Sequence, residues 1–308
     1  MTRNPSHHPC FNAGARHRWG RVHLPVAPGC NINCGYCQSK TDCVNESRPG
    51  VASALLDPGE AGAFFRKIKG REPGISVAGI AGPGDPFFAP ELTLKTLEYL
   101  RASYPDLLLC VSTNGLKLAD HIEALGDLGV DFVTVTVNAV APEILQRIVS
   151  RVQLNGRSKQ GYEAAGVLLE RQLTAISRLK ARGFTLKVNT VVIPGVNDGH
   201  VAAIATRLAP LRVDLMNLIP LIPVPGTPMA GYPAPGLALM SRLRAVAGLF
   251  IPQMRHCVRC RADAAGFLNP RAAAGTALPA RRRGWREGTC EADFPAIFHP
   301  GKRWGEGA

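Results

Sequence analysis

The chain alternates between short apolar runs and longer stretches in which apolar residues recur with helical spacing. The short runs predict six strands, at residues 22–26, 75–80, 107–111, 131–137, 185–193 and 213–219. The longer stretches predict helices at about 57–70, 91–103, 118–128, 142–149, 162–182 and 237–254, with one more helix between the last two strands. Helical sequence after each strand is typical of βαβ units, which form a parallel sheet.

Six such units with right-handed crossovers curl into an open barrel, so we predict an α/β fold with a partial (βα)6 TIM-like barrel. In such a barrel the residues that follow each strand meet at one face, where sites are built. The residues expected there are Cys30, Cys34, Cys37, Gly82, Gly84, Asp85, Ser112, Asn114, Thr136, Asn138, Val191 and Asn197. Each also has a plain alternative, because glycine and polar residues after a strand often only form a turn.

The two ends of the chain differ from the barrel. Residues 1–21 are a polar N-terminal extension without periodicity, and residues 22–235 are the predicted barrel. Residues 236–268 are predicted as a C-terminal helix with a Cys-x2-Cys segment. From residue 265 the sequence is rich in Ala, Gly, Pro and Arg, and we expect it to be mostly irregular, with a basic tail at 269–308.

Length and composition narrow the classes of function. The 308 residues suffice for one α/β barrel. No run of 18 apolar residues occurs, and the N-terminus lacks the apolar core of a secretory signal, so we expect a cytoplasmic protein. Nine cysteines then indicate metal or redox chemistry. The net charge of +13 favours an anionic ligand or an acidic partner over nucleic acid, because basic and aromatic residues do not alternate.

Three cysteines follow the first predicted strand in a Cys-x3-Cys-x2-Cys spacing, at Cys30, Cys34 and Cys37. Three thiolates can bind three irons of a [4Fe–4S] cluster and leave the fourth iron open. This spacing, with Tyr36 before the third cysteine, resembles the radical S-adenosylmethionine (SAM) superfamily, in which the open iron binds SAM and an electron from the cluster cleaves it. The alternative is a zinc site, which prefers paired Cys-x2-Cys units and four nearby ligands.

The run from residue 82 to 86 resembles the segment with which that superfamily holds the methionyl amine of SAM, although it reads Gly-Pro-Gly-Asp here. Further soft or imidazole donors are Cys10, His23, Cys43, Cys110, Cys257 and Cys260. Taken singly, each cysteine can be explained as an ordinary buried core residue, and His23 as a core histidine with its hydrogen bonds made within the protein. Together, so many donors around one barrel mouth favour additional iron–sulfur clusters.

Glu46 and Arg48 lie in a polar loop that ends in Pro49-Gly50. A glutamate and an arginine in such a loop suit proton transfer or contact with an anion. The alternative is a surface ion pair, which contributes little to stability.

Nine segments of the chain resemble the NifB family of nitrogenase iron–molybdenum cofactor biosynthesis proteins. The most specific are Asp42-Cys43-x-Asn45-Glu46-Ser47-Arg48-Pro49-Gly50 and His256-Cys257-x-x-Cys260-Arg261-Ala262-Asp263-Ala264. The other seven begin at His8, Val26, Ala81, Ser112, Val133, Glu170 and Leu218. Together they span about residues 8 to 268.

The resemblance implies a radical SAM enzyme, of lyase or transferase type, that serves nitrogen fixation. Such proteins fuse two [4Fe–4S] clusters, insert a carbide derived from the SAM methyl group and add one sulfur, giving an [8Fe–9S–C] precursor. It implies that Cys30, Cys34 and Cys37 hold the SAM cluster. It also implies that His23, Cys43 and Cys110 hold one substrate cluster, and that Cys10, Cys257 and Cys260 hold the other. Cys290 falls outside the pattern.

The resemblance also implies partners. These are an iron–sulfur cluster donor, a low-potential electron donor such as a ferredoxin, and the carrier or scaffold proteins of nitrogenase cofactor assembly. Some family members carry an additional C-terminal cofactor-binding domain, for which residues beyond 268 leave no room, so we expect a separate carrier. Neither nucleic acid nor membrane is an expected partner.

Two other functions stay open. One is a different radical SAM enzyme with auxiliary clusters, although such enzymes bind them mostly from a cysteine-rich C-terminal extension. The other is a non-catalytic iron–sulfur carrier, which would not cleave SAM to 5′-deoxyadenosine.

Overall fold

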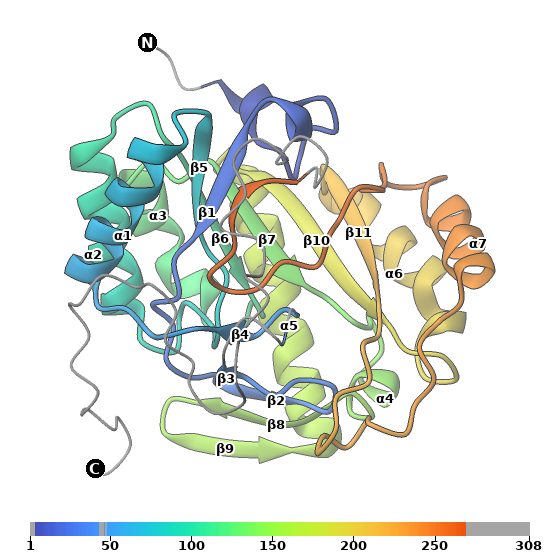
Figure 1. Ribbon diagram of the computed structural model, residues 1–308. Coiled ribbons are helices and arrows are strands. Elements are labelled where there is room, and N and C mark those ends of the chain that lie inside the picture. The colour runs from blue at the N-terminus through green and yellow to red at the C-terminus, as the bar shows by residue number, and fades with distance from the viewer. Residues whose placement is uncertain (1–3, 43–45, 47, 269–308) are drawn as a thin grey trace, which may run out of the picture. The chain divides into compact units, whose positions relative to one another are not determined.

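The six predicted strands form one parallel sheet whose order follows the chain. In the computed structural model, which describes residues 4–42, 46 and 48–268, the sheet order is β11-β10-β7-β6-β5-β1-β12. The parallel strands are β1 Gly20–His23, β5 Ile75–Ile80, β6 Leu108–Thr113, β7 Phe132–Thr136, β10 Thr185–Val192 and β11 Leu215–Pro220. The sheet curls around an interior (Figure 1), which confirms the predicted partial barrel.

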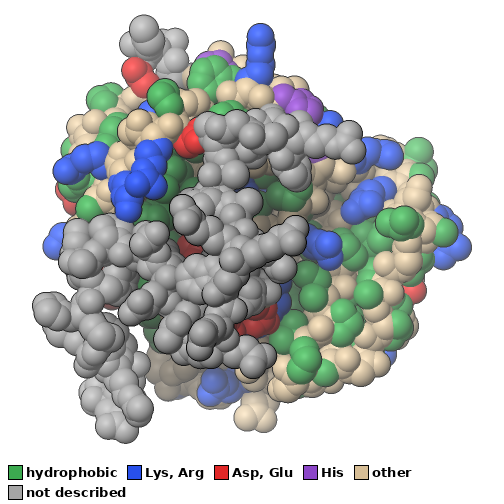
Figure 2. All heavy atoms as spheres, in the orientation of Figure 1, with side chains coloured by type: hydrophobic (Ala, Val, Ile, Leu, Met, Phe, Trp, Pro, Cys, Tyr) green, Lys and Arg blue, Asp and Glu red, His purple; other side chains and the backbone are tan. Residues whose placement is uncertain are grey.

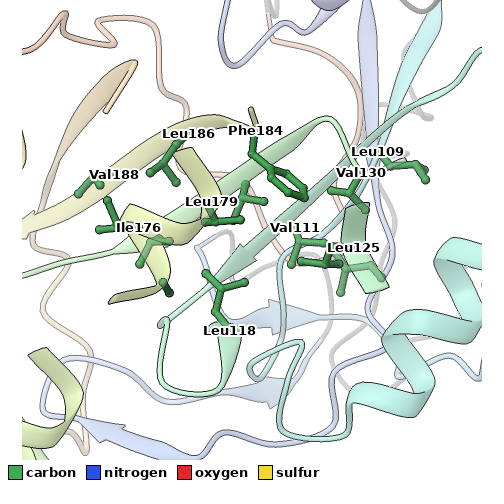
Figure 3. Packing of buried hydrophobic residues seen from close by; sticks show 14 of the residues in the cluster. Leu109, Val111, Leu118, Leu125, Val130, Ile176, Leu179, Phe184, Leu186 and Val188 are labelled. Atoms are coloured by element: carbon green, nitrogen blue, oxygen red, sulfur yellow. The ribbon is translucent and has the colours of Figure 1, made fainter. Parts of the chain in front are cut away.

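Helices cover the outer face of this sheet (Figure 1). They are α1 Pro58–Arg71, α2 Pro90–Ser103, α3 Ile122–Asp127, α4 Pro142–Leu145, α5 Gly161–Ala181, α6 Val201–Leu208 and α7 Leu237–Ala247. Short 3-10 turns are η1 Pro5–His7, η2 Ala15–His17, η3 Leu118–His121, η4 Asp198–His200 and η5 Ala209–Leu211. Helices and strands share a buried apolar layer (Figure 3) that includes Leu109, Val111, Leu125, Ile176, Leu179, Leu186 and Val188. Because side chains alternate along a strand, the remaining strand residues face the barrel interior.

A hairpin replaces part of one predicted helix. The helix predicted over 142–149 ends at Leu145, and β8 Val149–Leu154 pairs with β9 Arg157–Gln160 and with β2 Ile32–Cys34. The hairpin turns at Asn155 and Gly156, which both have positive φ, at 50° and 74°. An Asn-Gly pair is a strong signal for such a turn, and it outweighs the helical pattern before it. The hairpin matters for the site because β2 contains Cys34.

Two further boundaries differ from the prediction. The first strand ends at His23 instead of residue 26, and the last long helix ends at Ala247 instead of residue 254. Gly248 lies just past the end of α7, where glycine often stops a helix.

Residues 252–268, which we call the closing segment, bridge the two edges of the parallel sheet. At one edge the backbone N–H of Met254 donates to the carbonyl of Met216 in β11, at 2.8 Å. At the other, β12 Ala265–Phe267 pairs antiparallel with β1. The prediction of irregular chain from residue 265 was therefore wrong for this short strand, whose partner is the otherwise unpaired edge of β1. The closing segment carries Cys257 and Cys260 across the open side of the barrel.

The N-terminal extension covers the end of the barrel where the parallel strands begin. Ser76, at the start of β5, donates from its hydroxyl to the carbonyl of His7 at 2.8 Å. The ring of Phe11 packs on Phe132, with ring centroids 4.6 Å apart. Cys10 therefore enters from the end opposite the cysteine motif, which follows the carboxyl end of β1. The prediction that all donors surround one mouth is corrected accordingly, because they approach from both ends.

Lys and Arg side chains occur at several separate places on the face in Figure 2. This distribution resembles a diffuse positive field more than one concentrated patch. Among the described residues, no helix combines the length and the apolar character needed to cross a membrane. All described residues belong to one compact unit, Met1–Gly275.

Candidate active site

The barrel encloses a cavity of about 310 Å³. Its walls are the inward-facing strand residues, which include Arg21, His23, Gly79, Cys110, Ser112, Thr134, Thr136, Lys187, Asn189, Val191 and Asn217. Eight of the residues predicted as iron ligands line it: Cys10, His23, Cys30, Cys34, Cys37, Cys110, Cys257 and Cys260. Cys43 lies outside the described residues. We call the part with Cys30, Cys34 and Cys37 the outer end, and the part with Cys10, Cys257 and Cys260 the inner end.

The loop of the outer cysteines is held by backbone contacts on two sides. Gly35, between Cys34 and Cys37, donates its N–H to the carbonyl of Ile148 beside the hairpin, at 2.7 Å. On the other side, Gly84 donates to Ala27 at 2.9 Å and Asp85 donates to Gly29 at 2.7 Å. A Cβ at Gly84 would lie 1.8 Å from the Gly29 carbonyl oxygen, so this close approach requires glycine.

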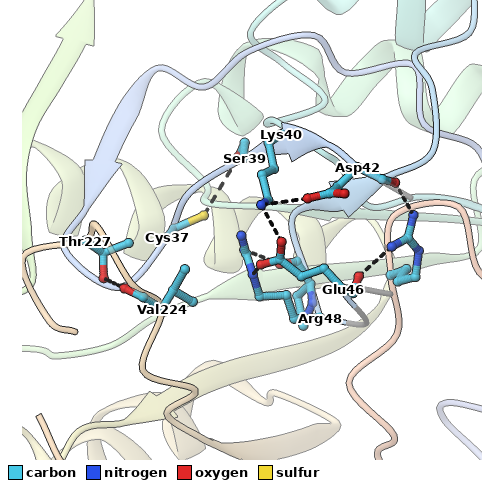
Figure 4. Close-up of polar contacts among 10 residues, drawn as sticks. Cys37, Ser39, Lys40, Asp42, Glu46, Arg48, Val224 and Thr227 are labelled. Atoms are coloured by element: carbon cyan, nitrogen blue, oxygen red, sulfur yellow. Dashed lines mark hydrogen bonds and ion pairs between the residues drawn. The ribbon is translucent and has the colours of Figure 1, made fainter. Parts of the chain in front are cut away.

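Of the three outer cysteines, Cys30 and Cys34 are half-buried and Cys37 is exposed, and few charged groups lie near them. Burial, followed by the Asp85 carboxylate, raises the pKa of Cys30 to about 12. Burial and then the two neighbouring cysteines raise the pKa of Cys34. The amide of Asn114 points to Cys30 Sγ at 3.6 Å, and the Ser39 hydroxyl lies 3.8 Å from Cys37 Sγ (Figure 4). Thiols that resist ionisation and repel one another as thiolates need a cation between them, so this donor set fits iron.

The three outer thiols do not form a site for a single metal ion. Within residues 4–42, 46 and 48–268, no three His, Cys, Asp or Glu side chains are close enough to hold one metal ion. A four-iron cube binds each cysteine through a different iron and therefore accepts a wider spacing.

Asp85 joins the ends of two strands. Its buried carboxylate accepts hydrogen bonds from the Thr113 hydroxyl at 2.8 Å, the Asn114 N–H at 2.7 Å and the Phe87 N–H at 2.9 Å. Burial raises the pKa of this carboxyl, and the three hydrogen bonds oppose that rise. Gly84 and Asp85 line the cavity, whereas Gly82 adopts a φ of +136° at the start of this loop. The carboxylate thus orients Asn114, which faces Cys30.

The later strands contribute a second polar wall. Asn138 donates from its amide to the Tyr36 hydroxyl at 2.9 Å and accepts from the Val191 N–H at 2.9 Å. Asn197 is buried and donates to the carbonyls of Asn138 and Val191. Ser112 and Thr136 line the same cavity, as do all the residues predicted after the strands except Gly82 and Asn197.

His23 and Cys110 face each other across Gly79. These three residues share one register row of β1, β5 and β6. A Cβ at Gly79 would meet His23 Cδ2 at 3.5 Å and Cys110 Cβ at 3.7 Å, so glycine leaves the space between them open. The Nδ1 of His23 lies 3.0 Å from the Arg261 carbonyl, which can only accept, so Nδ1 carries the proton and Nε2 keeps its lone pair. This is the usual state of an iron-binding histidine.

Burial, followed by the Arg21 charge, lowers the pKa of His23 to about 4, so this histidine is neutral near pH 7. At the inner end, burial raises the pKa of Cys10 to about 11, with Lys187 opposing and Cys260 and Cys257 adding to the rise. Cys10 therefore lies beside the two cysteines of the closing segment.

Glu46 and Arg48 lie between two short strands, β3 Lys40–Thr41 and β4 Val51–Ala52 (Figure 4). The Arg48 Nε donates to a Glu46 carboxylate oxygen at 2.5 Å, and Lys40 pairs with the same carboxylate. Hydrogen bonds from Lys40 and Arg48 lower the pKa of Glu46, so it is a fixed anion at neutral pH. Arg48 lines the cavity and its side chain is 6% exposed, which distinguishes it from an ordinary surface ion pair.

The motif that contains Arg261 and Asp263 ties this loop to the closing segment. Arg261 donates to the carbonyls of Glu46, at 2.5 Å, and Asp42, at 3.1 Å. Asp263 accepts from Arg261 at 2.9 Å and from the Ser53 N–H at 2.5 Å. These two residues therefore serve the site by positioning its loops.

The cavity residues that were not predicted as site residues from the sequence include His8, Arg21 and Lys187. The available signal was strand alternation. Arg21 lies two residues before His23, and Lys187 lies two before Asn189, so both face inward. His8 had no such signal, because its segment has no regular period.

The chain matches the Radical SAM superfamily over residues 24–208. It is 47% identical over 268 residues to the FeMo cofactor biosynthesis protein NifB of Chlorobaculum tepidum, covering 87% of this chain and 63% of that protein. With the Klebsiella pneumoniae protein of the same name it is 45% identical, covering 89% of this chain and 59% of the relative. The chain thus spans about three fifths of the length of these relatives, and the resemblance found in its motifs is confirmed.

Among solved structures, the crystal structure of Streptococcus suis SuiB bound to S-adenosylmethionine is similar, with a TM-score of 0.55. It is 13% identical, and the match covers 75% of this chain and 50% of that one. At this identity the likeness concerns the fold alone.

Proposed function

Because the chain belongs to the radical SAM superfamily, we propose that it builds a nitrogenase cofactor precursor, as its resemblance to NifB implies. In this reaction two [4Fe–4S] substrate clusters are fused, a carbide from the SAM methyl group is inserted and one sulfur is added. The product is an [8Fe–9S–C] cluster. The observation that supports this most is that one cavity is lined by donors enough for more than the resident cluster.

Cys30, Cys34 and Cys37 hold the resident [4Fe–4S] cluster in this proposal. When bound, that cluster supplies the electron that cleaves SAM. The residues that bind and orient SAM are Gly82, Gly84, Asp85, Ser112, Asn114, Thr136, Asn138 and Val191. Asp85 and Asn138 act by positioning, because their carboxylate and amide oxygens already accept hydrogen bonds from the protein.

His23, Cys43 and Cys110 hold one substrate cluster, and Cys10, Cys257 and Cys260 hold the other. The absence of a side chain at Gly79 leaves space for the cluster held by His23, Cys43 and Cys110. The Arg261 carbonyl accepts the Nδ1 proton of His23, so the Nε2 lone pair is available for iron. A neutral imidazole binds iron more weakly than a thiolate does. His23 can therefore release iron as the clusters fuse.

Arg48 and Glu46 act at the outer end. Arg48 faces the cavity and can contact the negative charge of the product, and its pairing with Glu46 fixes its side chain. Since Lys40 and Arg48 keep Glu46 ionised, the carboxylate can accept a proton but does not carry one at rest.

The proposed partners follow from the chemistry. A cluster donor supplies the substrates, a low-potential donor such as a ferredoxin supplies electrons, and a carrier or scaffold protein of nitrogenase assembly accepts the product. We place this work in the cytoplasm.

The deciding experiment is anaerobic reconstitution followed by iron counting and electron paramagnetic resonance (EPR), with and without SAM labelled in its methyl carbon. The proposal requires three clusters, formation of 5′-deoxyadenosine and label in the isolated iron–sulfur product. Deoxyadenosine without label in the product would indicate a different radical SAM enzyme. Absence of deoxyadenosine would indicate a cluster carrier.

A further inference from the structure

Arg21 brings a buried positive charge to the inner end of the cavity. It is 5% exposed, and one of its terminal nitrogens donates to Cys260 Sγ at 2.8 Å. The other donates to the carbonyl of Gly266 at 2.5 Å, which fixes the guanidinium on β12. Its Nε is buried and has no hydrogen-bond acceptor.

Lys187 brings a second buried charge from the opposite wall. It is 7% exposed and lies on β10, with its ammonium 4.7 Å from the centre of the Phe11 ring. Burial raises the pKa of the thiols of Cys10 and Cys110, and the positive charge of Lys187 lowers the pKa of both.

His8 adds a neutral donor near both cations. Its Nδ1 accepts the N–H of Cys10 at 3.1 Å, so the proton of the neutral ring is on Nε2. That nitrogen is buried without a partner, in a ring packed between Phe11 and Phe132. His8 thus presents an N–H donor, in contrast to His23, which presents a lone pair.

Among the described residues, no carboxylate neutralises the positive charges of Arg21 and Lys187. Within the described residues, Asp85 is the one carboxylate that lines the cavity, and it lies at the outer end. Neither Arg21 nor Lys187 forms an ion pair in the described part of the chain. Burial of an unpaired cation is costly, and lysine is almost never buried without a partner. The arrangement therefore calls for an anion inside the cavity.

A [4Fe–4S] cluster with three thiolate ligands is such an anion. We infer that Arg21, Lys187 and the Nε2–H of His8 form a cationic seat for the substrate cluster held by Cys10, Cys257 and Cys260, and that this seat raises its reduction potential above that of the SAM-cleaving cluster. The inference rests on the proposed function. Positive charge stabilises the reduced, more negative cluster. At the outer end, Arg48 is offset by Glu46, and Asp85 lies beside Cys30.

The test is a potentiometric titration of reconstituted protein without SAM, followed by EPR and paired with an iron count. Lys187→Met removes the charge at similar volume, Lys187→Arg keeps it, and Lys180→Met removes a lysine that pairs with Asp214 away from the cavity. The inner signal is identified as the one missing from a Cys257→Ala, Cys260→Ala variant. In the wild type this signal should be reduced first.

Lys187→Met should keep its iron and shift the inner signal to lower potential by roughly tenfold in the ratio of reduced to oxidised cluster, or about 59 mV for one electron. Lys187→Arg and Lys180→Met should leave it in place, and the SAM-cluster signal should not move. Arg21→Lys, which keeps the charge, should shift the inner signal less than Lys187→Met does. Selective loss of iron from Lys187→Met, with Lys187→Arg fully loaded, also supports the seat.

An unshifted inner signal in fully loaded Lys187→Met overturns the inference while the proposed function stands. Equal iron loss from Lys187→Met and Lys187→Arg also overturns it, because shape and not charge would then matter. A wild-type protein that binds no inner cluster contradicts the proposed function itself.

Discussion

The outer end of the cavity is built from neighbouring residues, whereas the inner end is assembled from residues far apart in the chain. Cys30, Cys34 and Cys37 lie within eight positions of one another, but Cys10 and Cys260 are separated by 250. The hydrogen-bonding neighbours of the outer thiols Cys30 and Cys37 are a neutral amide and a hydroxyl, whereas the inner thiols lie near the cations Arg21 and Lys187. A resident cofactor can thus be specified by a local motif, while a site for consumable clusters depends on the whole fold.

The largest effect should come from removing the outer ligands. Changing Cys30, Cys34 and Cys37 together to Ala should abolish SAM cleavage and leave the iron of the other two sites, because those ligands come from separate segments. Product assays for 5′-deoxyadenosine and iron counts measure the two effects. Loss of essentially all iron would contradict the independence of the two ends.

The converse change removes the inner ligands. Cys257→Ala with Cys260→Ala should lose one cluster of iron and stop precursor formation, while SAM is still cleaved at the outer end. Iron analysis and deoxyadenosine assays again report this. An iron content equal to that of the wild type would mean that the Cys-x2-Cys pair is structural.

His23 lies between the two ends, and its replacement should uncouple them. His23→Ala should retain the outer cluster and SAM binding but lose precursor formation, because Nε2 no longer binds iron. Pulsed EPR of the wild type should show nitrogen coupled to a cluster before SAM is added, and this coupling should vanish in His23→Ala and in His23→Cys. His23→Cys should restore cluster binding, because thiolate is also an iron ligand, but not cluster fusion, because the thiolate releases iron less readily. A nitrogen signal that survives in His23→Ala would assign the ligand to another histidine.

A partial effect is expected from Gly84→Ala. The new Cβ would clash with the Gly29 backbone, so the outer loop must shift and the protein should lose about 3 kcal/mol of stability. Iron at the outer site should fall more than iron at the inner site. Gly70→Ala in α1 is the matched control, since nothing lies within 4 Å of its Cβ, and it should be neutral or stabilising. Denaturant unfolding and iron counts of both variants test this.

The last effect concerns stability in acid. The folded pKa of His23 is lowered by burial to about 4, below its unfolded value of about 6.5. The unfolded chain therefore binds the proton first, and the free energy of unfolding of metal-free protein should fall as the pH drops from about 6.5 to about 4. His23→Gln should remove about 3 kcal/mol of that fall. An unchanged pH dependence would show that the acid sensitivity arises elsewhere.

The sequence was sufficient for the parallel strands because their apolar runs are buried on one face by helices. Ile75–Ile80 was predicted to the residue, and α1 begins with the capping box of Asp57 and Glu60. The β8–β9 hairpin was missed although Asn155-Gly156 signalled it. The strand Ala265–Phe267 has no strand pattern of its own, and it forms because the edge of β1 accepts it.

The candidate site was predictable where its residues follow strands, as at Asn114 and Asn138. Strand alternation places Arg21 on the same face as His23 and Lys187 on the same face as Asn189, but which face of each strand is the interior is known only once the sheet has curled. The approach of Cys10 from the opposite end depends on where Phe11 packs, and no local signal reports that.

The closing segment has a topological consequence. A cluster bound by Cys10, Cys257 and Cys260 would be a cross-link between the two ends of the described chain, closing a loop of about 250 residues. Like a disulfide across a long loop, it would stabilise the fold by restricting the unfolded chain, by roughly 5 kcal/mol on the entropic model. Since that cross-link is itself a substrate, each turnover would remove its stabilisation of the barrel, and binding of a new cluster would restore it.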